Sequence, residues 1–128
     1  MNRVLIDTNI YSQALRGDIS TTNILRKCKE IGLSVVSIAE LLAGFKLGNR
    51  FEKNLLELKQ FLDSPRVKVY PIDEITADYY SEIFMRLKRA GTPIPTNDIW
   101  ISAVVFQNGL KLFTEDRHFK KVEGLFLV

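Results

Sequence analysis

Four carboxylates occupy positions from which they can act together. Asp7, Glu40 and Asp116 each come just after a short apolar or β-branched run that predicts a strand, and Asp98 begins the apolar segment 99–106. The carboxyl ends of parallel strands share one edge of a sheet, where functional crevices form. Asp98 heads a helix that leads into the next strand, which places it at the same edge. We therefore expect all four acids in one crevice.

Carboxylates gathered in one crevice repel one another, and a hard divalent cation with oxygen ligands relieves that repulsion. We expect this cation to be Mg²⁺ or Mn²⁺. Such an ion activates water and neutralises charge on a phosphoryl group, so an acidic pocket can hydrolyse an acidic polymer. The pattern therefore favours a metal-dependent phosphodiester hydrolase.

Three of the acids also have a structural interpretation. Asp7 can cap the helix that follows it. Ser37 and Glu40 have the spacing of a capping box, in which the serine caps the helix and the glutamate reaches back to the chain. Asp116 can be a solvated turn residue. On these residues alone, both interpretations stay open.

Asp98 is less easily explained as a cap. A helix needs only one cap residue, and we expect Asn97 or Thr96 to serve, which frees Asp98 for the crevice. The segment that follows is apolar around nearly its whole circumference and should be buried, with Trp100 and Ile101 anchoring it in the core. A carboxylate at the head of a buried helix needs a partner.

Strands and helices alternate along the chain. The predicted strands are 4–6, 33–37, 67–72, 110–114 and 125–128, and the predicted helices are 22–31, 38–47, 51–63, 75–90 and 98–107. Gly32, Gly48, Gly91 and Gly109 each follow a helical stretch and are expected to end it. Parallel strands joined by helices predict an α/β class protein, a three-layer α/β/α fold with a central, mostly parallel sheet of about five strands.

Composition narrows the class of protein. The chain has 128 residues, of which 46% are hydrophobic and 26% charged, and we expect one domain spanning 1–128. Cys28 is the only cysteine, which excludes an internal disulfide framework and fits a reducing cytoplasm. We expect no signal peptide and no membrane anchor, because the apolar runs are short. The net charge of +3 is compatible with a polyanionic partner but does not demonstrate one.

Four segments together resemble a known family. They are LIDTN at 5–9, SIAEL at 37–41, PTNDIWISA at 95–103 and TEDRHF at 114–119. In this order, they resemble the PIN-domain ribonucleases, and in particular the VapC-type toxins of toxin–antitoxin pairs. The resemblance covers essentially the whole chain. It implies a PIN fold and a metal-dependent endonuclease that acts on RNA.

The same resemblance implies roles for individual residues. Asp7, Glu40, Asp98 and Asp116 fall on the family's acidic positions and would hold or orient the metal and the attacking water. Asn9 and Thr114 fall on polar positions that support the acids. The sole histidine, His118, is interpreted as structural or peripheral.

Two protein partners are implied as well. A cognate VapB-type antitoxin would wrap over the early helices and reach the acidic site with a basic side chain. The apolar faces of 22–31 and 38–47 could form its groove, although core packing explains most of these residues equally well; the residues are Ile24, Leu25, Leu41, Leu42 and Phe45. A homodimer is also implied, and Tyr79, Tyr80, Phe84 and Met85 are candidates for its interface.

Basic residues near the expected site have two interpretations. Lys46, Arg50 and Lys53 form one group, and Arg86, Lys88 and Arg89 another. Either group could contact RNA phosphates, or could simply be a solvated helix face.

Two rival functions remain at this stage. A phosphatase of the haloacid-dehalogenase type would use Asp7 as a nucleophile, but its loop needs a second aspartate where this chain has Asn9. A non-catalytic PIN module would bind RNA or a partner without cutting. Such a module gains little from repelling carboxylates where phosphates must sit.

Overall fold

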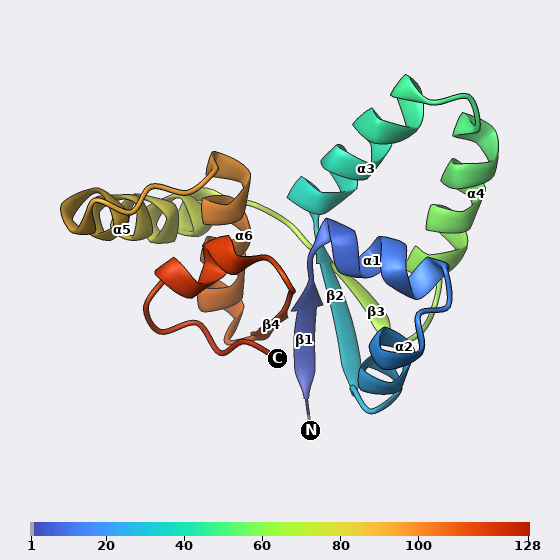
Figure 1. Ribbon diagram of the computed structural model, residues 1–128, viewed down its shortest axis with the longest axis horizontal. Coiled ribbons are helices and arrows are strands. Elements are labelled where there is room, and N and C mark those ends of the chain that lie inside the picture. The colour runs from blue at the N-terminus through green and yellow to red at the C-terminus, as the bar shows by residue number, and fades with distance from the viewer. Residues whose placement is uncertain (1) are drawn as a thin grey trace.

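A computed structural model describes residues 2–128, and it contains one parallel sheet (Figure 1). The strand order is β3-β2-β1-β4, and the strands are β1 (Arg3–Ile6), β2 (Glu30–Ser34), β3 (Val67–Tyr70) and β4 (Lys111–Phe113). β1 therefore lies between β2 and β4, where Leu5 pairs with Gly32 on one side and Leu112 on the other. The predicted α/β class and parallel sheet are confirmed.

The helices lie on both faces of this sheet. They are α1 (Thr8–Leu15), α2 (Ile19–Arg26), α3 (Val35–Leu47), α4 (Phe51–Leu62), α5 (Glu74–Ala90), α6 (Thr96–Asn108) and the 3₁₀ helix η1 (Arg117–Lys121). Figure 1 shows α1 to α4 on one side of β1 and α5, α6 and η1 on the other. Alternation along β1 explains this division. Val4 and Ile6 belong to the core cluster with α1 to α4, whereas Leu5 packs with α6.

The early part of the chain differs from the sequence prediction. Strand 33–37 was placed too late, because β2 ends at Ser34, whose hydroxyl accepts hydrogen bonds from the backbone N–H groups of Val36 and Ser37 and caps α3. Helix 22–31 was also misplaced: α2 starts after its cap, Asp18, and ends at Arg26. The N–H of Lys29 already bonds to the carbonyl of Asn2, which draws the chain into the sheet.

Two further elements differ from the sequence prediction. The eight-residue helix α1 was not among the predicted helices, because it is short and polar on one face. The predicted fifth strand, 125–128, pairs with β4 through a single bridge between Leu127 and Leu112. Of the predicted helix-ending glycines, Gly91 and Gly109 are left-handed caps, whereas Gly48 has negative φ and Gly32 lies inside β2.

None of the helices within residues 2–128 combines the length and apolar character that crossing a membrane requires.

Gly32 is needed for the packing of β2 against Tyr70 of β3. A Cβ atom at Gly32 would lie 2.7 Å from Cε2 of the Tyr70 ring. The ring cannot easily move, because it is 2% exposed and its hydroxyl donates to the Glu30 carboxylate. Burial and this contact with Glu30 raise the pKa of Tyr70 to about 12, so the phenol remains a donor at neutral pH.

Replacing this glycine tests the close approach. We expect Gly32→Ala to lower the free energy of unfolding by about 1–3 kcal/mol, since the ring or a strand must shift. The matched control is Gly44→Ala in α3, where an added Cβ meets no atom within 4 Å. That change should be neutral or raise the free energy of unfolding by up to about 1 kcal/mol. Urea denaturation measures both, and equal effects would contradict the packing argument.

Candidate functional site

All four predicted acids line one small cavity at the carboxyl edge of the sheet. The cavity measures about 140 Å³, and its lining includes Asp7, Asn9, Glu40, Asp98 and Asp116. The acids come from four segments that are far apart in the sequence: the end of β1, α3, α6 and the turn before η1. The expectation that they meet in one crevice therefore agrees with the structure.

Asp7 combines a structural contact with a place in the cavity. It follows β1 directly, is 6% exposed, and accepts a hydrogen bond of 2.9 Å from the N–H of Ile10 that caps α1. The hydroxyl of Thr114 donates to its other oxygen, Oδ2. The same hydroxyl oxygen accepts from the N–H of Asp116 at 3.0 Å. Thr114 thus joins Asp7 to Asp116.

Glu40 lies within α3 and is no part of a capping box. Because Ser34 caps this helix, Ser37 lies inside it and the predicted Ser37–Glu40 box is wrong. The Glu40 side chain instead points toward neighbouring segments. Its Oε1 accepts from the hydroxyl of Thr8 at 2.9 Å, and its Oε2 accepts from the amide of Asn97 at 3.3 Å. These two donors fix the exposed carboxylate over the cavity.

The start of α6 also differs from the prediction. The cap position is Pro95 and has no side-chain hydrogen bond, so neither Thr96 nor Asn97 caps the helix. Asn97 binds Glu40 instead, a role that a local motif cannot reveal. Ile101 is buried as expected, whereas Trp100 is only partly buried and packs on Tyr80 with ring centroids 4.3 Å apart.

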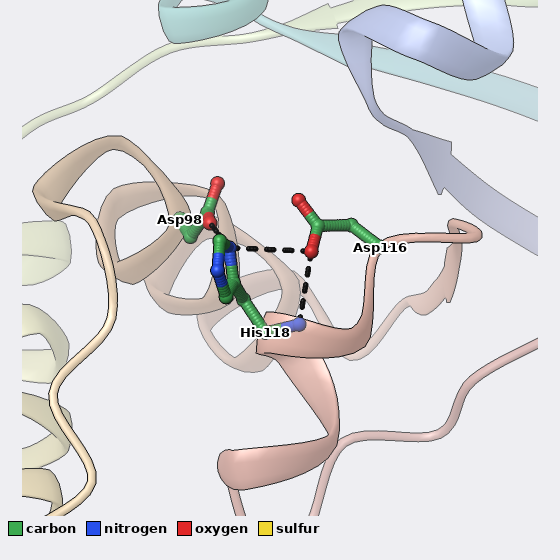
Figure 2. Close-up of side chains that lie close together, drawn as sticks. All are labelled: Asp98, Asp116 and His118. Carbon is green, nitrogen blue, oxygen red and sulfur yellow. Dashed lines mark hydrogen bonds and ion pairs between the residues drawn. The ribbon is translucent and has the colours of Figure 1, made fainter.

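His118 contacts two of the acids (Figure 2). Its Nδ1 lies 3.1 Å from Oδ2 of Asp98 and 3.2 Å from Oδ1 of Asp116. These three side chains offer ligand atoms that all lie within 4.8 Å of one another. The sequence interpretation of His118 as structural or peripheral did not foresee this contact. The sequence signal that could have indicated this contact was the position of His118, two residues after Asp116 at the start of η1.

The electrostatics of the cavity favour a cation. Burial raises the pKa of Asp7, and the nearby charges of Asp116 and Glu40 raise it further against the lowering effect of its hydrogen bonds. Burial likewise raises the pKa of Asp98, with Asp116 and Glu40 adding to the effect and His118 opposing it. Clustered carboxylate oxygens suit a hard divalent ion such as Mg²⁺. The donor set therefore fits the expected metal.

Comparison with known proteins identifies the family. The family model described as "PIN domain" matches residues 4–125. The chain belongs to the PIN domain family. Ribonuclease VapC10 of Mycobacterium tuberculosis is 30% identical over 126 residues, covering 95% of this chain and 90% of the relative. Ribonuclease VapC2 of Rickettsia felis is 27% identical over 128 residues, covering 96% and 94%.

Solved structures agree with this assignment. VapBC2 from Rickettsia felis, solved with a DNA fragment from its promoter, superposes with a TM-score of 0.87 at 26% identity and covers 98% of this PIN domain and 96% of that chain. FitAcB from Neisseria gonorrhoeae gives a TM-score of 0.78 at 25% identity, with coverage of 97% and 95%. The resemblance stated from the sequence, a VapC-type PIN domain, is confirmed.

The raised pKa of Asp7 predicts how stability varies with pH in the presence of a chelator. Between the native pKa and the ordinary value of 3.8, the native state binds more protons than the unfolded chain. The contribution of Asp7 to the free energy of unfolding should therefore rise as the pH falls through that window. Asp7→Asn should be more stable than the wild type near pH 7, and this advantage should shrink toward about pH 4.

Thr114→Val is the companion variant, because it removes a hydrogen bond that lowers the pKa of Asp7. Near pH 7 it should lose about 1–3 kcal/mol of unfolding free energy. Denaturation series at several pH values measure both variants. A pH-independent difference between Asp7→Asn and the wild type would contradict the argument.

Proposed function

We propose that this PIN domain is a metal-dependent endoribonuclease of the VapC toxin type, hydrolysing phosphodiester bonds of cellular RNA. The observation that carries the proposal is the convergence of Asp7, Glu40, Asp98 and Asp116 on one cavity of about 140 Å³. A cavity of this size admits an ion, a water and a phosphoryl group. The kinship with VapC ribonucleases supplies the substrate class.

The four acids would hold Mg²⁺ or Mn²⁺, with Asn9 beside them and Thr114 supporting. When bound, the ion polarises the phosphoryl oxygen and lowers the pKa of water. Buried Asp7 is fixed by Ile10 and Thr114, so it offers a rigid ligand. Exposed Glu40 is held by Thr8 and Asn97 and would orient the attacking water and accept its proton.

His118 has a separate role in this proposal. Its Nδ1 lies between Asp98 and Asp116 and holds their carboxylates near one another. The imidazole therefore positions two of the ligands, and its side chain, 45% exposed, stays accessible to the RNA phosphate that enters the cavity.

The similarity to solved VapBC structures supports a proposal about the protein partners of this chain. VapBC2 of Rickettsia felis is among the similar solved structures, and we propose that this chain is likewise the toxin of a pair, acts in the cytoplasm and is inhibited by a VapB-type antitoxin of its own. Leu25 and Leu41 are buried in the core, so the antitoxin must use other parts of the early helices. A homodimer is proposed through α5, where Tyr79, Phe84 and Met85 are each about 40% exposed.

The non-catalytic alternative is less favoured by the same geometry. A module that only binds RNA has no need for four converging carboxylates, two of which have raised pKa values. The phosphatase alternative also fits poorly, because its loop needs a second aspartate where this chain has Asn9.

The first test is cleavage of a cellular RNA pool by the purified protein with Mg²⁺ or Mn²⁺. Asp98→Asn should lower the cleavage rate about 100-fold or more, and a chelator should abolish cleavage. Asp78→Asn, which removes an exposed carboxylate on α5, is the matched control and should cut normally. Thermal unfolding adds a second readout: Mg²⁺ should stabilise the wild type and Asp78→Asn but not Asp98→Asn. Intact RNA from folded wild type with metal would refute the proposal.

The partner proposal has its own test. The tagged protein, purified from its own host, should carry a small second chain. When that chain is separated and added back to the toxin, RNA cleavage should stop. A co-purified chain that leaves the cleavage rate unchanged would contradict its role as an antitoxin.

A further inference from the structure

A polar stripe runs along α1 away from the acids. Asn9, Ser12, Gln13 and Arg16 are spaced as i, i+3, i+4 and i+7, so they share one face of the helix. The opposite face, with Ile10 and Tyr11, is buried in the core. From Asn9 to Arg16 the stripe extends roughly 10 Å along the helix axis, at 1.5 Å per residue.

This stripe lines a second cavity that neighbours the first. The second cavity measures about 370 Å³ and is lined by Asn9, Ser12, Gln13, Arg16, Glu115 and Asp116. Asn9 and Asp116 also line the acidic cavity, so the two cavities adjoin at these residues. The acidic cavity is smaller than the roughly 300–1,000 Å³ of ordinary ligand pockets, whereas the second cavity is within that range.

Two side chains of the stripe, Gln13 and Arg16, can donate hydrogen bonds to a polar ligand. The amide of Gln13 is anchored, because its Oε1 accepts from the hydroxyl of buried Thr21 at 2.9 Å. Its Nε2 group has no hydrogen-bond partner within residues 2–128 and remains available as a donor. Arg16 forms no ion pair with any described residue, although Glu115 lines the same cavity.

We infer that this stripe binds the RNA segment next to the bond that is cut, with the Arg16 guanidinium on a backbone phosphate and Gln13 donating to the adjoining nucleotide. The inference rests on the proposed function. A substrate whose scissile phosphate lies among the acids must continue into the adjoining space, and guanidinium groups bind phosphate through paired, charge-assisted hydrogen bonds. The cavity that Arg86, Arg89 and Lys121 line shares no residue with the acidic one.

The test compares Arg16→Ala with Arg26→Ala in cleavage of a short single-stranded RNA of randomised sequence. Arg26 is another exposed arginine that precedes β2 and so lies at the opposite, amino end of the sheet. Arg16→Ala should lower kcat/KM about 10-fold, and Arg16→Lys should recover part of the loss. Binding of the same RNA in a chelator should show a salt slope reduced by about 0.7 for one lost phosphate contact.

A second variant examines Gln13 without disturbing Thr21. Gln13→Glu keeps the oxygen that accepts from Thr21 but replaces the amide donor with a negative charge, and it should weaken RNA binding and alter the preferred cleavage site. Stabilisation by Mg²⁺ should persist in every variant, which separates loss of RNA contact from damage to the acids.

Each outcome is decisive. If the wild type cuts RNA and Arg16→Ala cuts equally well, the inference fails while the proposed function stands. The inference also fails if Arg26→Ala loses as much activity as Arg16→Ala. If the folded wild type neither binds nor cuts RNA, the proposed function fails and this inference fails with it.

Discussion

The rest of the site depends on the burial of one carboxylate, Asp7, at the end of the central strand. A buried carboxylate is costly unless it is paired, and here it receives hydrogen bonds from Ile10 and Thr114. Those two contacts connect the start of α1 with the segment after β4. Because β1 and β4 are adjacent and parallel, their carboxyl ends are close enough for this contact.

The other acids are arranged around Asp7 by the two faces of the sheet. α3 brings Glu40 from the side of α1 to α4, and α6 brings Asp98 from the opposite side. Thr8 and Asn97, one from each side, bind the two oxygens of Glu40. The site therefore lies where the helix layers on the two faces of the sheet meet. The packing of both layers restricts the motion of the side chains in the site.

This arrangement stores unfavourable electrostatic energy in the metal-free protein. The raised pKa values of Asp7 and Asp98 reflect that cost, which comes first from burial and then from the neighbouring charges of Asp116 and Glu40. A bound divalent cation would offset the repulsion between these carboxylates and so would stabilise the folded chain. Trading stability for a functional site in this way is common in enzymes.

The fold class and the four candidate acids of this protein could be predicted from the sequence alone. The parallel α/β class follows from alternating strands and helices, and the candidate acids Asp7, Glu40, Asp98 and Asp116 follow from their positions after strands or at a helix start. Both depend on local patterns that are complete within a few residues. The sequence analysis misplaced the end of β2 and the start of α2, which the caps Ser34 and Asp18 set, and it misplaced the end of α2, after which Lys29 bonds to the chain at the start of β1.

Only the tertiary structure decided which side chains hold the acids. Asn97, one of the two expected caps of α6, binds Glu40, 57 residues away in the sequence. His118, interpreted as structural or peripheral, contacts Asp98. The short helix α1, absent from the predicted elements, carries the polar stripe beside the site. The physical reason is that hydrogen bonds between distant segments exist only once the two layers pack, and no local motif encodes the distance between them.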